Sequence, residues 1–257
     1  MIICFSGTGN TRRVAQALGS LLGETDIREM TASMLRHPEA AEIALSPGDS
    51  RVIWAFPTYS WGVPPVVAEL MKRFNAGAGV ADATHLMLTT CGDDVAYADR
   101  QWRRIMRRRG FATGGAFGVC MPNTYVCMKG FDVDSREVAD RKLAAMPDAV
   151  KEIAHAIATG GPDILPRLSW SAIKTYVIYP SFARFAMSAK PFRVTGGCTG
   201  CGTCSRKCPM DNISMRDGTP QWGDRCALCL KCYHICPRHA IAYGSATEGK
   251  GQYILDR

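Results

Sequence analysis

Eight of the twelve cysteines in this 257-residue chain lie between Cys198 and Cys236, in two runs with the same spacing. Each run reads C-x2-C-x2-C-x3-C-P, and the second follows the first at an interval of 28 residues. Three thiolates spaced in this way on a tight loop can bind three corners of one iron–sulfur cube. The duplication therefore predicts two equivalent sites, each holding a 4Fe-4S cluster. The runs are Cys198, Cys201, Cys204 and Cys208, then Cys226, Cys229, Cys232 and Cys236.

The fourth cysteine of each run precedes a proline and is expected to turn toward the other cluster. The sequence thus assigns Cys236 to the cluster of the first three cysteines, and Cys208 to the cluster of Cys226, Cys229 and Cys232. Paired C-x2-C units also form structural zinc sites, but zinc takes four ligands and leaves the extra cysteine and the proline unused. Residues 195–245 resemble the bacterial-type ferredoxin domain, including the CPRHAI stretch of the second run.

A second set of candidate residues, Ser6-Gly7-Thr8-Gly9-Asn10-Thr11, joins a predicted strand to a predicted helix. Hydroxyls and glycine amides at a helix N-terminus form a cradle that suits a phosphate group. The segment lacks the Gly-Lys-Ser/Thr ending of a Walker loop, and Arg12 stands where a dinucleotide fingerprint has its third glycine. The predicted ligand is therefore a smaller phosphate compound.

Two later loops follow predicted strands: Pro57-Thr58-Tyr59-Ser60-Trp61-Gly62 and Cys91-Gly92-Asp93-Asp94-Val95-Ala96-Tyr97. In an open parallel sheet both loops lie at the carboxyl edge, beside the phosphate loop. Residues 1–160 look like a short-chain flavodoxin. This resemblance implies FMN, with its phosphate on Ser6 to Thr11 and its isoalloxazine ring between Trp61 and Tyr97, where Gly62 faces N5. Ordinary core packing is the alternative for each aromatic ring.

Short apolar runs alternate with helical stretches through the first 160 residues, which predicts a parallel sheet covered by helices. We expect a flavodoxin-like α/β fold of five strands in the order 2-1-3-4-5, with a small α+β ferredoxin-like domain at the C-terminus. The predicted parts are residues 1–160, an amphipathic aromatic connector at 161–194, the cluster domain at 195–245 and a tail at 246–257. Strands are expected at 2–5, 26–30, 52–56, 85–90 and 115–120, and helices at 10–22, 65–74, 95–108 and 135–158.

Composition excludes disorder and fibrous repeats, because 47% of the residues are hydrophobic and 21% are charged. The formal charge is +8, and two clusters and an FMN phosphate would reduce it to about +2. No nucleic-acid motif accompanies the basic residues. The N-terminal residues do not resemble a signal peptide, and we expect a cytoplasmic protein. We expect no transmembrane segment. The connector is predicted to pack the two domains together, and peripheral membrane contact is the alternative. A redox protein is the expected partner; the arginines at 103–109 are either a solvated helix face or a docking patch for an acidic partner.

The whole chain resembles flavodoxin and ferredoxin fusion proteins of anaerobic bacteria and archaea. This resemblance predicts an electron carrier that passes electrons between FMN and two 4Fe-4S clusters, and so links two-electron and one-electron partners. One alternative is a flavin-dependent reductase of a small acceptor such as a quinone, supplied through its clusters. Another is a redox sensor. No pair of nucleophile and base is evident, so no catalytic residue is assigned.

Overall fold

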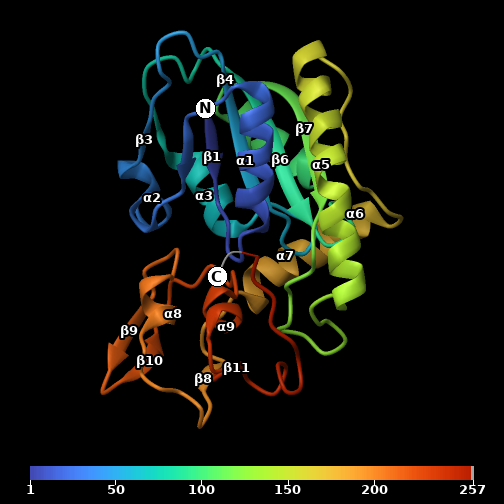
Figure 1. The fold of residues 1–257 in the computed structure, drawn as a ribbon. Coiled ribbons are helices and arrows are strands. Elements are labelled where there is room, and N and C mark those ends of the chain that lie inside the picture. Colours follow the sequence, from blue (N-terminus) through green and yellow to red (C-terminus); the bar gives the residue numbers. More distant parts are fainter. Residues whose placement is uncertain (256–257) are drawn as a thin grey trace.

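The computed structural model describes residues 1–255, so the last two residues of the predicted tail lie outside the described part of the chain. An N-terminal α/β domain carries a smaller C-terminal domain at the carboxyl edge of its sheet (Figure 1). A helical connector lies beside this junction. Within residues 1–255, no helix combines the length and hydropathy that a membrane crossing requires.

The central sheet has five parallel strands in the order β2-β1-β4-β6-β7. Counted over these five strands, this is the predicted order 2-1-3-4-5. It is also the flavodoxin-type order, with ligand sites at the carboxyl ends of the strands. The strands are β1 (Ile2–Cys4), β2 (Ile27–Glu29), β4 (Arg51–Pro57), β6 (Thr84–Cys91) and β7 (Ala112–Cys120). A short additional pair, β3 (Glu42–Ile43) and β5 (Asn75–Ala76), was not predicted.

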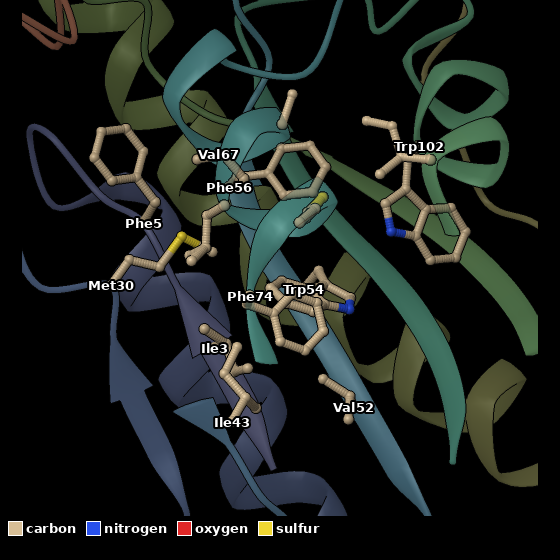
Figure 2. Packing of buried hydrophobic residues seen from close by; sticks show 14 of the residues in the cluster. Ile3, Phe5, Met30, Ile43, Val52, Trp54, Phe56, Val67, Phe74 and Trp102 are labelled. Carbon is tan, nitrogen blue, oxygen red and sulfur yellow. The ribbon is translucent and has the colours of Figure 1, made fainter. Parts of the chain in front are cut away.

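Both faces of the sheet are buried, because successive strand residues point to opposite sides and both sides are apolar. In β4, Val52, Trp54 and Phe56 pack into one hydrophobic cluster (Figure 2). The intervening Ile53 and Ala55 pack into the cluster on the other face. A near-continuous apolar run, rather than an alternating one, is therefore what positions the loops at the end of this strand.

Helices cover the two faces in pairs. The helices α1 (Asn10–Leu22) and α5 (Arg136–Thr159) pack on one face, and α3 (Pro65–Arg73) and α4 (Ala98–Arg108) pack on the other. Gly160 ends α5 in the left-handed conformation, with φ 68°, close to the predicted end of the first domain. The short helices α2 (Ala32–Arg36) and η1 (Pro38–Ala40) complete the domain.

The connector contains one nearly continuous helical stretch, from residue 171 to residue 186. Its consecutive pieces are α6 (Ser171–Ile173), η2 (Lys174–Ile178), α7 (Tyr179–Ser181) and η3 (Phe182–Ala186). The η2 and η3 pieces are π-helical. Isolated π turns are frequent at functional sites, which indicates that this segment is more than a linker.

The C-terminal domain is built from two small antiparallel pairs and two single-turn helices. These are β8 (Phe192–Val194), α8 (Thr203–Arg206), β9 (Ile213–Arg216), β10 (Thr219–Trp222), α9 (Lys231–Ile235) and β11 (Ile241–Tyr243). β8 falls in the range predicted for the connector, yet it pairs with β11 and so contributes a strand to this domain. After β11 the chain returns to the N-terminal domain, where the Leu255 amide donates to the Thr8 carbonyl.

Candidate redox centre

The eight clustered cysteines gather around two separate cavities. Each cavity takes three cysteines from one run and the last cysteine of the other run, which is the grouping that the sequence predicts. Among residues 1–255, no three His, Cys, Asp or Glu side chains converge tightly enough for a single metal ion. We call Cys198, Cys201, Cys204 and Cys236 the outer group, and Cys208, Cys226, Cys229 and Cys232 the inner group.

The 28-residue repeat of the sequence is also a repeat of backbone geometry. Gly200 and Gly202 have φ values of 69° and 70°, and their equivalents in the second run, Leu228 and Leu230, have 49° and 59°. Left-handed residues turn backbone amides toward the thiols. The Gly200 amide lies 3.5 Å from the sulfur of Cys198. The Leu228 amide lies 3.3 Å from that of Cys226. Such N–H···S contacts lower the energy of charge on a cluster and tune its potential.

The two cysteine groups differ in exposure. Cys198 and Cys201 of the outer group are exposed to solvent. The inner group lies against the N-terminal domain, because Met210 and Ala227 are buried in the same hydrophobic cluster as β4. A Cβ placed on Gly7 would lie 2.7 Å from the Cys229 carbonyl oxygen. The first turn of the phosphate loop therefore touches a residue of the inner group directly.

The phosphate loop contains two buried oxygens that have no hydrogen-bond partner, Ser6 Oγ and Asn10 Oδ1. Asn10 is 8% exposed, and its Nδ2 donates to the Pro122 carbonyl at 2.9 Å, which holds the amide in place. Helix α1 begins after Gly9 without a side-chain cap. Polar atoms left unsatisfied beside free helix N–H groups fit a phosphate group that binds there. Thr11 is tied to β6 through a hydroxyl contact with Thr90.

The loop after β4 makes a tight turn in which Tyr59 and Gly62 exchange backbone hydrogen bonds. Ser60 and Trp61 at its tip have positive φ values of 44° and 65°. The side chain of Trp61 lies under Lys174, whose Nζ is 5.4 Å from the centroid of the ring. Tyr97, at the end of the loop after β6, lies under Arg100, whose Cζ is 3.6 Å from the centroid of the Tyr97 ring. Each ring is thus in contact with a cation.

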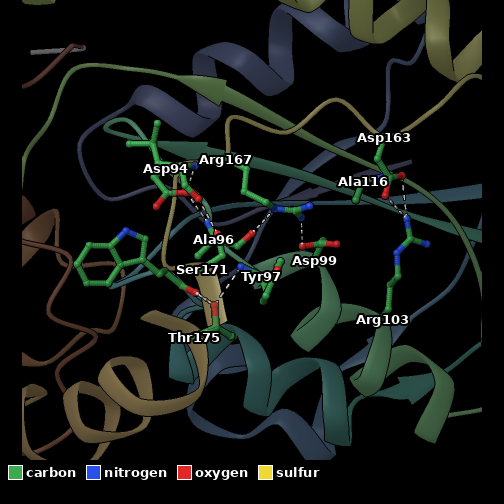
Figure 3. Close-up of polar contacts among 12 residues, drawn as sticks. Asp94, Ala96, Tyr97, Asp99, Arg103, Ala116, Asp163, Arg167, Ser171 and Thr175 are labelled. Atoms are coloured by element: carbon green, nitrogen blue, oxygen red, sulfur yellow. Dashed lines mark hydrogen bonds and ion pairs between the residues drawn. The ribbon is translucent and has the colours of Figure 1, made fainter. Parts of the chain in front are cut away.

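The connector bridges these two loops. Thr175 Oγ1 accepts from the Tyr97 amide at 3.0 Å and donates to the Trp61 carbonyl at 3.1 Å (Figure 3). Tyr179 packs on Gly62, where an added Cβ would come within 2.3 Å of the ring, and its hydroxyl donates to the Val63 carbonyl at 2.6 Å. The predicted position of the isoalloxazine ring between Trp61 and Tyr97 therefore requires movement of the connector, and it stays a prediction.

Two ion pairs link the connector to the loop after β6 and to the first turn of α4. Lys174 Nζ lies 2.6 Å from Asp94. Arg167 lies 2.6 Å from Asp99 (Figure 3). Burial alone would raise the pKa of Asp94, but hydrogen bonds from Lys174 and from the amides of Ala96 and Leu168 outweigh it and lower the pKa. The carboxylate is therefore charged at neutral pH, and the connector is a docked part of the fold.

Sequence reasoning did not identify the loop that follows β7. Besides Pro122, this loop contains Thr124, whose carbonyl is 2.8 Å from Nε2 of His234 in α9. The Tyr253 amide donates to the other ring nitrogen of His234 at 3.1 Å. His234 thereby links the helix of the inner group to the N-terminal domain. The available signal was topological, since β7 must end at the same sheet edge as the other parallel strands.

Cys91 and Cys120 are register partners on adjacent strands at this edge. A hydrogen bond from the Cys91 thiol lowers the pKa of Cys120 to about 7. We predict that alkylation of Cys120 by iodoacetamide rises with a midpoint near pH 7, because the thiolate is the nucleophile. Cys91→Ala should move the midpoint toward the ordinary 9.0. Peptide mass spectrometry after timed labelling measures this, with buried Cys4 as an internal unlabelled control. A midpoint unaffected by Cys91→Ala would contradict the prediction.

Strand order and cysteine grouping define the class of protein: a flavodoxin-like α/β domain joined to a domain with two cysteine-ligated sites. Residues 197–241 match the family model of the 4Fe-4S dicluster domain. The C-terminal part is therefore a 4Fe-4S dicluster domain, and the chain is a flavodoxin-like and ferredoxin fusion. No curated protein matches the chain.

Solved structures with some similarity to this chain include three that cover about 60% of it. The Trp repressor binding protein of Bacillus subtilis is 13% identical with a TM-score of 0.37, over 59% of this chain and 96% of that one. A flavodoxin of Streptococcus pneumonia is 16% identical with a TM-score of 0.33, over 60% and 96%. An azoreductase of Bacillus anthracis is 11% identical with a TM-score of 0.36, over 62% and 99%. With TM-scores of 0.33 to 0.37, these structures give no support to a shared function. The fold of the N-terminal domain is defined by its strand order.

Proposed function

We propose that this protein transfers electrons between an FMN and two 4Fe-4S clusters held in one chain. The observation that carries the proposal is the direct contact between the phosphate loop and the inner cysteine group, at Gly7 and Cys229. A flavin site and a cluster site that share a backbone contact are close enough to exchange electrons without a second protein. When bound, FMN supplies two-electron chemistry and each cluster supplies one-electron chemistry.

The residues that would hold the FMN phosphate are those of the loop Ser6 to Thr11, with Ser6 Oγ and Asn10 Oδ1 as the unsatisfied polar atoms. The residues that would hold the ring are in the loops Pro57 to Gly62 and Cys91 to Tyr97. The outer and inner cysteine groups would each hold one cluster. Their amide donors would stabilise negative charge on the cysteine sulfurs.

The difference in exposure gives the two cysteine groups different roles in the proposal. The outer group, with Cys198 and Cys201 at the surface, would face the protein partner. The inner group, packed into the core that it shares with β4, would exclude water and face the flavin loops. The outer group, the inner group and the flavin loops would thus follow one another from the surface to the interior. This order suits a carrier that exchanges electrons with a protein partner at the outer group.

A reductase of small acceptors is the second candidate. Thr175 and Tyr179 close the region between Trp61, Gly62 and Tyr97, so ring binding there moves the connector in a carrier and in a reductase alike. The exposure of Cys198 and Cys201 favours the carrier, because docking by a protein partner needs only the exposed cluster domain.

Ser6→Ala tests the phosphate site. We expect FMN affinity to fall about 10- to 100-fold, because a hydrogen bond to a charged group contributes about 1.5–3 kcal/mol. Thermal stability without FMN should not fall, since Ser6 Oγ has no partner to lose. Quenching of FMN fluorescence measures the affinity. Ser20→Ala is the matched control, because the Ser20 hydroxyl is exposed on helix α1, which follows the phosphate loop. Unchanged FMN affinity in Ser6→Ala would refute the proposed phosphate site.

A further inference from the structure

The helical part of the connector buries polar side chains and exposes apolar ones. Ser171, Thr175 and Tyr179 are buried. The hydroxyls of Thr175 and Tyr179 donate to carbonyls of the N-terminal domain, and that of Ser171 donates to the Leu168 carbonyl within the connector. Apart from Lys174, which pairs with Asp94, the large residues between them are apolar and exposed, for example Ile173 and Val177. A surface helix normally buries its apolar stripe and turns its polar side to water. Here the polar side is buried and the apolar side is exposed.

The exposed apolar residues form a surface that we call the connector face. Trp170 is 72% exposed, Val177 60% and Phe185 74%. Single exposed apolar side chains are ordinary, but a concentration of large ones along one short segment marks an interaction site. The face consists of Leu168, Trp170, Ile173, Tyr176, Val177 and Phe185.

Charge along the same segment has one sign. Residues 164–193 contain five Lys or Arg residues and no Asp or Glu. Arg167 and Lys174 are engaged with acids of the N-terminal domain. Arg184 and Lys190 are paired with no acid among the described residues and lie on the part of the segment that follows Val177. Arg184 lies over the ring of Phe185, at 5.5 Å. The connector face is therefore an apolar surface with free cations at its margin.

We propose that the connector face docks the protein onto the surface of an anionic lipid bilayer, with Trp170, Val177 and Phe185 entering the interfacial region. An aromatic and aliphatic face with flanking Lys and Arg is the composition that interfacial helices use on anionic membranes. A second copy of this chain fits less well, because a two-fold contact would set the cationic margin against its own equivalent. The contact is peripheral, since the segment is too short to span a bilayer.

Docking by this face also places the membrane beside the redox loops. Thr175 and Tyr179, on the opposite side of the same helix, contact the backbone of Trp61, Val63 and Tyr97. The surface in contact with lipid is thus one helix diameter from the loops proposed to hold the flavin ring, about 10 Å. The inference stands independently of the proposed function, because lipid binding depends on the exposed face alone.

The experiment is flotation of the reconstituted full-length protein with vesicles. One set contains phosphatidylcholine alone, and the other contains phosphatidylcholine with phosphatidylglycerol. The test variant is Val177→Ser with Phe185→Ser, which removes apolar area from exposed positions only. The matched control is Leu21→Ser, because Leu21 is an apolar residue of similar exposure, 52%, on helix α1. Absorbance of the bound cofactors and the melting temperature report whether each variant is folded.

We expect the protein and Leu21→Ser to float with anionic vesicles, and the double variant to bind at least about tenfold more weakly. Trp170 should be quenched by brominated lipid. Failure of the folded protein to bind anionic vesicles would overturn the proposal. Equal binding by the double variant would also overturn it. A dimer in sedimentation that the double variant abolishes, or retention on a polyglutamate resin without vesicle binding, would assign the face to a protein partner instead.

Discussion

Replacing both Cys198 and Cys236 by alanine is expected to leave about half of the iron, whereas replacing Cys198 and Cys208 should remove nearly all of it. Each double variant removes one first-position and one fourth-position cysteine of the repeated motif, so the two variants differ in which cavity loses its ligands. Cys198 and Cys236 line one cavity, while Cys208 lines the other. The first double variant therefore damages one proposed cluster site, and the second damages both.

Iron and sulfide analysis of anaerobically reconstituted protein distinguishes the two arrangements. We expect about eight irons in the parent chain, about four in the first double variant and close to none in the second. If each run instead bound its own cluster, the two variants would exchange these values. The single variant Cys127→Ala is the control, since Cys127 is not among the residues that line either cavity. A loss of iron in this control would indicate that unfolding, rather than lost ligation, lowers the iron content.

Gly7→Ala is expected to have the largest effect on the contact between the two domains. The new methyl group would lie 2.7 Å from the Cys229 carbonyl oxygen and 3.0 Å from its Cβ. A backbone carbonyl cannot rotate away as a flexible side chain can, so the inner cysteine loop has to move. Overpacking of this kind costs about 1–3 kcal/mol of unfolding free energy. We also expect slower electron exchange between cluster and flavin, because the shared backbone contact is lost.

Chemical denaturation measures the stability change, and stopped-flow absorbance after cluster reduction measures the exchange rate. Gly196→Ala is the matched control, because a Cβ at Gly196 would meet no atom within 4 Å. The control should leave both values unchanged. Normal exchange in a Gly7→Ala protein of normal stability would contradict the role that we assign to this contact.

Local sequence patterns were sufficient for the sheet and for the cysteine grouping. Helix α1 has the predicted bounds, Asn10–Leu22, because a glycine at each end and a regular apolar stripe define it. The strand order follows from alternating strands and helices, which leave few topologies. The spacing of the cysteines along the chain limits which of them can reach the same cluster. It therefore predicted which cysteines line each cavity.

The sequence patterns did not predict the contacts between segments that are far apart in the chain. The connector was predicted as an amphipathic segment, but nothing in its periodicity shows that Thr175 and Tyr179 contact the loops of Trp61 and Gly62. From the sequence alone, the polar residues on the buried side of the connector would be expected to face solvent. Strand β8 was assigned to the connector because three residues carry too little alternation to reveal a distant partner strand. Its residue Val194 pairs with Ile241, 47 residues later.

The central claim is that one chain holds a flavin and two clusters that exchange electrons. The most direct test is anaerobic reconstitution with iron, sulfide and FMN, followed by gel filtration, cofactor analysis and stepwise reduction monitored by visible and EPR spectra. We predict about eight irons and one FMN per chain, and flavin absorbance that follows cluster reduction within the same molecule. A protein that retains both clusters but no FMN, or whose flavin is not reduced when its clusters are, would contradict the account.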